Sequence, residues 1–316
     1  MIVVLTGGTG GAKFVDGLQQ VVPPEHLTFI VNTGDDVRWW GLHVSPDVDS
    51  ILYVLAGLLS KERGWGVQAD TFFCLQTMRT LGQAAWFQVG DKDLATHLLR
   101  TQLLNEGKTL SATTAELAVR LRISSRVLPM SDNPVETRVE IPSGEISFAE
   151  YFVQRRYQDP VTSVRFAGAE SAGPAPGVVQ AILSAEAVLL APSNPITSIG
   201  PILAVRAIRE ALRETNAPVV AVSPIVGGAA VSGPAGALMR AQGLDVSIAA
   251  VAEFYRDFLD VLVVDETDPT PPEGLRTAVE RAQTIMRTNA DRAELAIAVM
   301  EIARRAMTPP AGVQRA

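Results

Sequence analysis

Residues 2–14 read IVVLTGGTGGAKF and decide the fold. Ile2 to Thr6 are apolar and mostly β-branched, which favours a buried strand. Gly7 to Gly11 predict a tight turn, and the apolar spacing from Ala12 to about Val22 predicts a helix. A second apolar run, Leu27 to Val31, completes a β-α-β unit of the kind that builds a parallel sheet. The opening of the chain is therefore Rossmann-like.

The rest of the chain continues this alternation after a helical interval. Apolar residues recur at three-to-four spacing in four segments and predict helices at 51–59, 71–81, 94–105 and 113–120. Strand-like runs follow at 126–130, 136–141, 187–191, 219–222 and 261–264. Two further helices are predicted at 148–155 and 202–213.

These segments predict an α/β fold with a Rossmann-like, mainly parallel sheet, helices on both faces and a mostly helical insertion. We expect a single domain at 1–307, with a core from about 1–50 and 126–307 and an insertion at about 51–125. The last residues, 308–316, read TPPAGVQRA, and we expect them to form a disordered tail.

The composition limits the kinds of partner. Against 34 acidic residues stand 27 basic ones, and the net charge of −7 supplies no cationic field for nucleic acid or membranes. The single cysteine excludes an intrachain disulfide and a multi-cysteine metal site. Two uncharged stretches, 187–205 and 215–239, are interrupted by proline and glycine, so neither predicts a transmembrane helix. The start has no basic region or cleavage site of a signal peptide, so we expect a cytoplasmic protein.

The glycine turn is the first candidate binding site. Such a turn, between a buried strand and a helix start, lets a ligand approach the backbone, and its free amides face an anion. We therefore assign a phosphate to Gly8, Thr9, Gly10 and Gly11. Lys13 either clamps that phosphate or is a solvated lysine of the first helical turn. The turn fits neither the G-x-G-x-x-G frame nor the Walker spacing, so a purely structural turn is the alternative.

Acidic residues follow the second strand and lead into the next helix. Asn32, Asp35 and Asp36 lie where nucleotide-binding folds place contacts to a ribose or base, with an ordinary Asx turn as the alternative. Asp47 and Asp49, just before a helix start, suit a hard divalent cation such as Mg²⁺. Capping of that helix by Asp49 or Ser50 is the alternative.

A further cluster mixes acid and imidazole at one predicted helix start. Asp91 and Asp93 precede a helix that carries His97. These residues could take part in acid or base chemistry. The alternative is that Asp93 caps the helix and His97 lies on the surface.

The ends of the later strands carry hydroxyl, amide and glycine groups. Ser193 and Asn194 follow the strand at 187–191, and Ser223 and Gly227 follow the strand at 219–222. Because ligands bind at the carboxyl edge of open parallel sheets, these ends and the glycine turn predict a cleft for a phosphorylated, nucleotide-like ligand. The sequence contains no G-x-S-x-G or H-E-x-x-H motif, so acyl-enzyme and zinc chemistry are not expected.

The chain resembles the 2-phospho-L-lactate transferases (CofD-like) of deazaflavin coenzyme F-420 biosynthesis. The resemblance runs from the first residue to about Asp268 and rests on nine motifs in order: GGTGGAK, NTGDD, SPDVDS, GDKDLATH, LPMSDNPVETRVE, PSNPITSIGPIL, SPIVGG, VSGPAG and AEFYRDFLDVLVVDE. It implies a Rossmann-like core with a helical insertion, a homodimer and dependence on Mg²⁺. It also implies a reaction: the terminal hydroxyl of the deazaflavin Fo attacks the phosphate next to a lactyl or enolpyruvyl group in a guanosine diphosphate-linked donor. The product is a phosphodiester, and GMP is released.

The resemblance also implies roles for individual residues. Asp49 is the first candidate for contact with metal and deazaflavin, and Asp47 is the second. Gln88 stands where the family often has a basic residue that contacts the deazaflavin, so a hydrogen bond replaces a charged contact there. Asp49 or Asp91 is the candidate acceptor for the proton of the attacking hydroxyl. The guanosine diphosphate part would be held by Gly7–Gly11, Asn32, Ser193, Asn194 and the loop that begins at Ser223.

Two other functions compete with this interpretation. Nucleotide-sugar-binding regulators share the GGTGG opening and would bind without turnover, but they have no need of SPDVDS, GDKD or LPMSDNPV. A nicotinamide-dependent oxidoreductase is suggested by the β-α-β opening and Asp36, but the chain lacks the G-x-G-x-x-G frame of that class.

Overall fold

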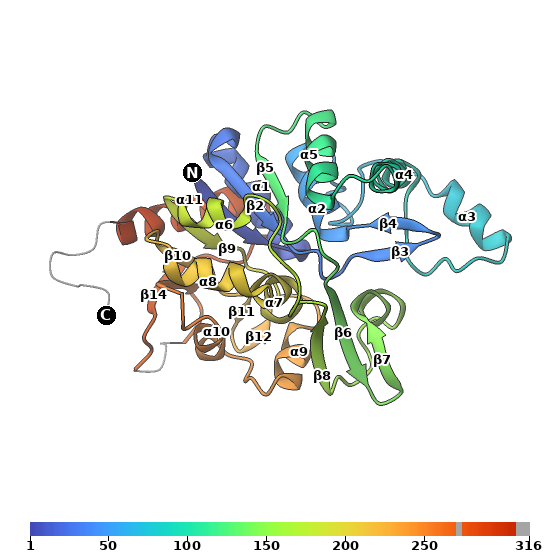
Figure 1. The fold of residues 1–316 in the computed structure, drawn as a ribbon. Helices are drawn as coiled ribbons and strands as arrows, with labels where there is room; N and C mark the ends of the chain where they lie inside the picture. The colour runs from blue at the N-terminus through green and yellow to red at the C-terminus, as the bar shows by residue number, and fades with distance from the viewer. Residues whose placement is uncertain (270–273, 308–316) are drawn as a thin grey trace.

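A seven-stranded sheet forms the centre of the molecule (Figure 1). The computed structural model describes residues 1–269 and 274–307, so the predicted disordered tail at 308–316 lies outside the described residues. Every pair of neighbouring strands is parallel, which confirms the predicted fold class. In spatial order the strands are β14 (Ala278–Ala282), β13 (Val261–Asp265), β10 (Val219–Val222), β9 (Ala187–Leu190), β1 (Ile2–Thr6), β2 (Leu27–Val31) and β5 (Arg126–Pro129).

Helices cover both faces of this sheet because its strands bury side chains on both sides. Val4 and Phe29 pack against one set of helices: α1 (Gly8–Val21), α2 (Pro46–Leu55) and α11 (Asn289–Met307). Val3 and Leu5 face the other set: α6 (Val178–Leu183), α7 (Gly200–Ala204), α8 (Arg206–Glu214), α9 (Ala235–Ala241) and α10 (Ile248–Phe254). Helices α1 and α11 approach so closely that a Cβ at Gly17 would overlap the carbonyl of Arg292.

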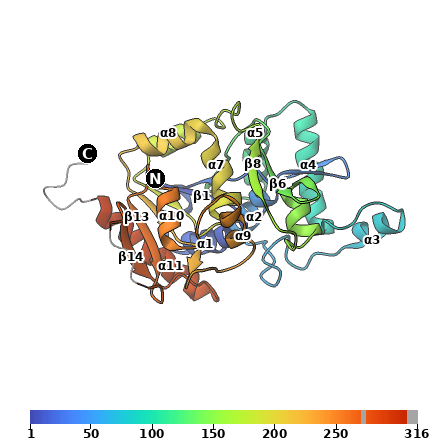
Figure 2. The same cartoon turned by 90° about the horizontal axis from the view of Figure 1, so that it is seen from below.

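Smaller elements surround the central sheet. Between β2 and β5 lie the hairpin of β3 (Val37–Trp39) and β4 (Leu42–Val44), and the helices α2, α3 (Phe73–Thr80), α4 (Asp91–Asn105) and α5 (Leu110–Arg120). Figures 1 and 2 show α3 at the opposite end of the molecule from α11. A separate antiparallel sheet has the order β7 (Gly144–Ser147), β6 (Glu136–Ile141), β8 (Ser163–Ala167). Short pieces complete the description: the hairpin β11 (Ile225–Val226) and β12 (Ala229–Ala230), the 3₁₀ turn η1 (Pro24–His26), and the π-helical turns η2 (Glu150–Gln154) and η3 (Pro195–Ile199).

Two predicted helices differ in the structure. The segment 202–213 is divided into α7 and α8, because Val205 adopts an extended conformation and its side chain is buried. The segment 148–155 forms one π-helical turn, η2, in place of the longer helix that the sequence predicted. Within the described residues, no helix is long and apolar enough to cross a membrane.

The strand order creates a place for a ligand. From β1 the sheet continues through β2 and β5 on one side and through β9, β10, β13 and β14 on the other. Loops that leave the carboxyl ends of β1 and β9 therefore diverge, and ligands of open α/β sheets bind at such a point. The glycine turn follows β1 there, and Ser193 and Asn194 follow β9.

Candidate active site

A cavity of about 1090 Å³ lies at this carboxyl edge. Loops that follow β1, β9, β10 and β14 form its floor, together with the start of α2. The cavity brings together fourteen of the candidate residues named from the sequence: Gly7, Gly8, Thr9, Gly10, Lys13, Asp35, Asp47, Asp49, Gln88, Asp93, His97, Ser193, Asn194 and Ser223.

The glycine turn is the first turn of a helix. Helix α1 begins at Gly8, earlier than the apolar spacing predicted, so its first amides lie at the cavity. The N–H of Gly8 donates to Oδ1 of Asp47 at 2.8 Å. A Cβ at Gly10 would overlap the carbonyl of Pro192, so glycine allows the two strand ends to approach. Gly11 is buried beneath the cavity wall, against Thr6.

Two carboxylates at the cavity share one hydrogen-bond donor. The side-chain amide of Asn32 donates to Oδ2 of Asp47 at 2.9 Å and to Oδ2 of Asp35 at 3.2 Å. Burial raises the pKa of Asp47 to about 6, although its hydrogen bonds from Asn32 and Gly8 oppose the rise. Burial, and then the charge of Asp47, raise the pKa of Asp35 well above its usual range. Within the described residues the two carboxylates lack a cationic partner.

This pair has the chemistry of a site for a hard cation. Oδ1 of Asp35 is buried and makes no hydrogen bond of normal geometry. Divalent ions such as Mg²⁺ take carboxylate oxygens, and their charge would remove the repulsion between Asp35 and Asp47. The sequence analysis assigns a metal to Asp47 and Asp49, and it names Asp35 only as a candidate for nucleotide contact.

Asn32 and Asp36 lie behind the cavity wall. Asn32 is fully buried and orients the two carboxylates. Oδ2 of Asp36 accepts from Ser45 Oγ at 2.7 Å and lies 2.9 Å from Nε2 of His43. Burial raises the pKa of Asp36, and its contact with His43 offsets part of the rise. These contacts tie the β3–β4 hairpin to the start of α2, so Asp36 supports the cavity wall in this structure.

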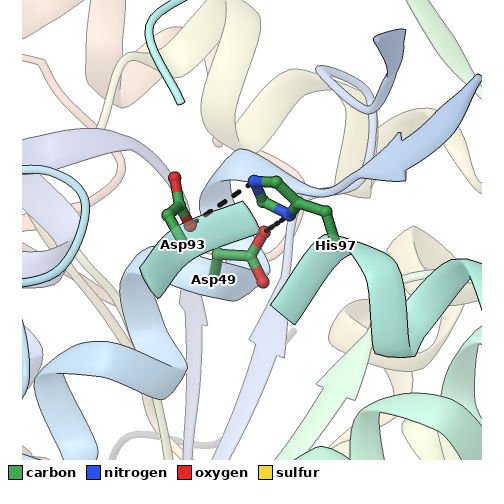
Figure 3. Close-up of side chains that lie close together, drawn as sticks. All are labelled: Asp49, Asp93 and His97. Carbon is green, nitrogen blue, oxygen red and sulfur yellow. Dashed lines mark ion pairs between the residues drawn. The ribbon is translucent and has the colours of Figure 1, made fainter. Parts of the chain in front are cut away.

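Asp49 belongs to a buried network of charges. Both of its carboxylate oxygens accept from Arg100, whose Nη1 lies 3.0 Å from Oδ2. His97 lies between two carboxylates, with Nδ1 3.5 Å from Asp49 and Nε2 3.4 Å from Asp93 (Figure 3). The hydroxyl of Tyr53 donates to Asp93 at 2.7 Å. The network joins α2 to α4, and Asp49, Tyr53, Asp93 and His97 line the cavity.

Two capping alternatives from the sequence are wrong. Helix α2 begins at Pro46, so neither Asp49 nor Ser50 is at its cap position. Helix α4 begins at Asp91, and His97 is only 1% exposed, because it packs between the two carboxylates. The spacing between Asp93 and His97 was visible in the sequence, but Arg100 was not recognised as their neighbour.

The same cluster is a second arrangement that could bind a metal. Asp49, Asp93 and His97 place one ligand atom each within 4.8 Å of one another. However, the guanidinium of Arg100 already neutralises Asp49, and the two ring nitrogens of His97 face different carboxylates. A cation there would meet a buried positive charge. The pair Asp35 and Asp47 therefore fits a divalent ion better.

Besides Gly11, Asn32 and Asp36, two further predicted residues lie outside the cavity, Asp91 and Gly227. The carboxylate of Asp91 accepts from the hydroxyl of Thr71 and from the N–H groups of Phe73 and Cys74, which lowers its pKa and caps α3. Asp91 is thus occupied by a structural role. The N–H of Gly227 donates to Asp268 Oδ1 at 2.6 Å, which holds the β11–β12 hairpin against the end of β13.

Aromatic and cationic side chains complete the cavity wall, and of these the sequence prediction identified only Lys13. The aromatic residues are Tyr53, Trp65, Trp86, Phe87, Phe148 and Phe152. The cationic residues are Lys13, Arg79, Arg156 and Arg287. The walls therefore offer flat apolar surfaces for rings and positive charge for anions. Trp86 and Phe87, directly before Gln88, were the available signal in the sequence.

Comparison with known proteins agrees with this geometry. The family model described as 2-phospho-L-lactate transferase CofD matches residues 2–306. The chain belongs to the CofD family of 2-phospho-L-lactate transferases. A 2-phospho-L-lactate transferase of Methanosarcina mazei is 41% identical over 303 residues, which cover 95% of this chain and 99% of the relative. A phosphoenolpyruvate transferase of Streptomyces coelicolor is 44% identical over 315 residues, with 97% of each chain covered.

Solved structures show that the CofD fold is shared more widely. A protein of the UPF0052 family from Bacillus halodurans superposes with a TM-score of 0.63, covering 95% of this chain and 98% of that one. Its sequence is 16% identical, so the likeness concerns the fold alone. The named sequence relatives are transferases, and they support a transferase activity for this CofD family member.

The buried pair of Arg100 and Asp49 gives a stability prediction. Arg100→Met should lower the free energy of unfolding by about 3 to 5 kcal/mol, because it leaves the carboxylate of Asp49 buried without its partner. The double variant Asp49→Leu/Arg100→Met should recover most of that loss. Urea unfolding checks both, with Arg79→Met as the matched control on an exposed arginine of the same cavity. A loss no larger than that of the control would contradict the role of the pair.

The raised pKa of Asp47 gives a prediction about pH. Its folded pKa of about 6 exceeds the ordinary 3.8, so its contribution to stability is present below pH 3.8 and lost as the pH rises through 6. Between pH 5 and pH 7.5, with divalent ions removed, about half of the full loss should appear, roughly 1 to 2 kcal/mol, and it should be absent in Asp47→Asn. Added MgCl₂ should stabilise the protein more at pH 7.5 than at pH 5, since the ion binds the charged carboxylates. Urea unfolding at both pH values, with EDTA or MgCl₂, measures this, and equal effects of MgCl₂ would contradict it.

Proposed function

We propose that this protein is a transferase of coenzyme F-420 biosynthesis. It moves a phospholactyl or phosphoenolpyruvyl group from a guanosine diphosphate-linked donor to the terminal hydroxyl of the deazaflavin Fo, and GMP is released. The observation that carries the proposal is that one cavity joins helix-terminal amides, a pair of acidic side chains and aromatic walls. Its volume of about 1090 Å³ is at the upper end for single small molecules, as a site for two substrates requires.

The floor of the cavity suits the diphosphate of the donor. The first amides of α1 and the side chain of Lys13 offer donors and positive charge to phosphate oxygens. Ser193, Asn194 and Ser223 add hydroxyl and amide groups from the ends of β9 and β10. We therefore assign the donor to this side of the cavity.

A magnesium ion fits the carboxylate pair next to the glycine turn. We propose that Asp47 holds it, with Asp35 as the second carboxylate in place of Asp49. When bound, the ion would neutralise charge on the transferring phosphoryl group. Asn32 fixes both carboxylates, and the Gly8 N–H fixes Asp47, so the site is oriented before substrate arrives.

The acceptor is assigned to the side of the cavity lined by Trp86, Phe87 and Gln88. Flat aromatic side chains offer surface to a planar ring, and the amide of Gln88 can donate or accept a hydrogen bond. In the transfer the hydroxyl oxygen forms a bond to phosphorus, the bond from phosphorus to the oxygen of GMP breaks, and the hydroxyl proton leaves. Of the two carboxylates proposed to take this proton, Asp49 lines the cavity and Asp91 does not. Alignment of the two substrates supplies most of the rate.

The proposal is tested by following the conversion of Fo with lactyl, enolpyruvyl and glyceryl guanosine diphosphate donors, each with and without MgCl₂. We expect conversion with one donor and only with the ion. Asp47→Asn should lower kcat by roughly 10²- to 10³-fold, and Asp49→Asn should lose far more turnover than donor binding. Asp91→Asn, outside the cavity, is the control and should keep turnover near that of the unmodified protein.

The competing function gives a different result in the same assay. A nucleotide-sugar-binding regulator would bind nucleotides and convert Fo with none of the donors. Tight binding of uridine diphosphate sugars, together with indifference to guanosine nucleotides, would replace the transferase proposal with that function.

A further inference from the structure

The segment between β7 and β8 forms part of the cavity wall and contains an unusual turn. After η2 (Glu150–Gln154), two successive residues adopt left-handed backbone conformations: Arg156 with φ of 51° and Tyr157 with φ of 46°. Residues other than glycine rarely adopt this conformation, because Cβ crowds the backbone. Two in succession indicate that surrounding contacts impose the turn, and such strain gathers at ligand-binding positions.

Those contacts can be identified. The N–H of Tyr157 donates to the carbonyl of Tyr151 at 2.9 Å, which closes the turn. The ring of Tyr157 stacks on Phe152, with centroids 5.6 Å apart and planes at 19°. Phe152 stacks in turn on Phe148, at 5.5 Å and 20°. The three rings hold the turn in place, and Phe148 and Phe152 line the cavity.

Two adjacent arginines in this turn have different surroundings. Arg155 pairs with Glu150 at 2.9 Å and with Asp159 at 3.6 Å, and it does not line the cavity. Arg156 lines the cavity and has no ion pair with any described residue. In a chain with net charge −7, an arginine without an acidic partner in a cavity wall is available to an anion from outside.

We propose that Arg156 is a substrate-binding residue that pairs with an oxyanion of the donor. The identity of the donor rests on the proposed function. The oxyanion is either a phosphate or the carboxylate of the three-carbon acid, since the guanidinium fork binds both through two parallel hydrogen bonds. The left-handed turn directs this side chain into the cavity, while the acidic partners of Arg155 keep the neighbouring charge out of it.

The test compares Arg156→Ala with Arg155→Ala, which removes the same charge one residue away. Isothermal titration with GDP and with the guanosine diphosphate-linked donor, without acceptor, measures binding. We expect Arg156→Ala to weaken donor binding roughly 10- to 100-fold and Arg155→Ala to change it less than threefold. If GDP binding weakens equally, the oxyanion is a phosphate; if only donor binding weakens, it is the carboxylate. If Arg156→Ala binds GDP and the donor as tightly as Arg155→Ala binds them, the proposal is overturned.

A second variant separates the side chain from the backbone. Arg156→Gly accepts the left-handed conformation without strain, so it should unfold at a temperature no lower than Arg156→Ala and bind the donor as weakly. Donor binding restored by glycine would contradict a direct role for the guanidinium. These titrations need no turnover, so they separate the two proposals. If the unmodified protein converts no Fo, while Arg156→Ala still weakens the binding of the donor or of GDP, the transferase proposal is refuted and the binding role of Arg156 is supported.

Discussion

Four acidic side chains near the carboxyl ends of β1 and β2, two buried and two half-buried, are the constraint on which the site depends. A carboxylate removed from water is stable only with a partner, and the protein supplies partners unequally. Asp49 has Arg100 and His97, and Asp36 has His43 and Ser45. Asp35 and Asp47 share one neutral amide, and they face the cavity. The uncompensated charge is therefore located where a ligand enters.

The scaffold around these carboxylates is rigid for reasons found in the sequence. Parallel strands buried on both faces fix the positions of their ends, and glycine at the start of α1 allows those ends to approach each other. The pair of Arg100 and Asp49 fastens α4 to α2, so the start of α2 cannot move independently. The result is a cavity whose polar groups are in place before a substrate binds, which reduces the entropic cost of binding.

Much of this fold could be predicted, because its signals are local. The β-α-β opening and the strand at 219–222 depend on short apolar runs, and the structure has β1, β2 and β10 at those positions. The edge strand β14 reads AVERA and gives no such signal, because its side chains are partly exposed. The site residues predicted at the strand ends lie in one cavity, because parallel strands bring their carboxyl ends to the same edge of the sheet.

The partners of the site residues could not be predicted in this way. Arg100 and Asp49 are 51 residues apart, and nothing local in either segment indicates that they meet. The burial of His97 and the capping of the start of α3 by Asp91 likewise follow from how α3, α4 and α2 pack. Sequence patterns identified which residues carry chemistry, and tertiary contacts decided which of them face the ligand.

The central claim is that the uncompensated carboxylates, and not the cluster around His97, hold the divalent ion. Diffraction from crystals soaked in MnCl₂, measured at a wavelength where manganese scatters anomalously, locates the ion directly. We predict an anomalous peak between the carboxylates of Asp35 and Asp47. A peak between Asp49, Asp93 and His97, with the carboxylates of Asp35 and Asp47 free of metal, would contradict the account.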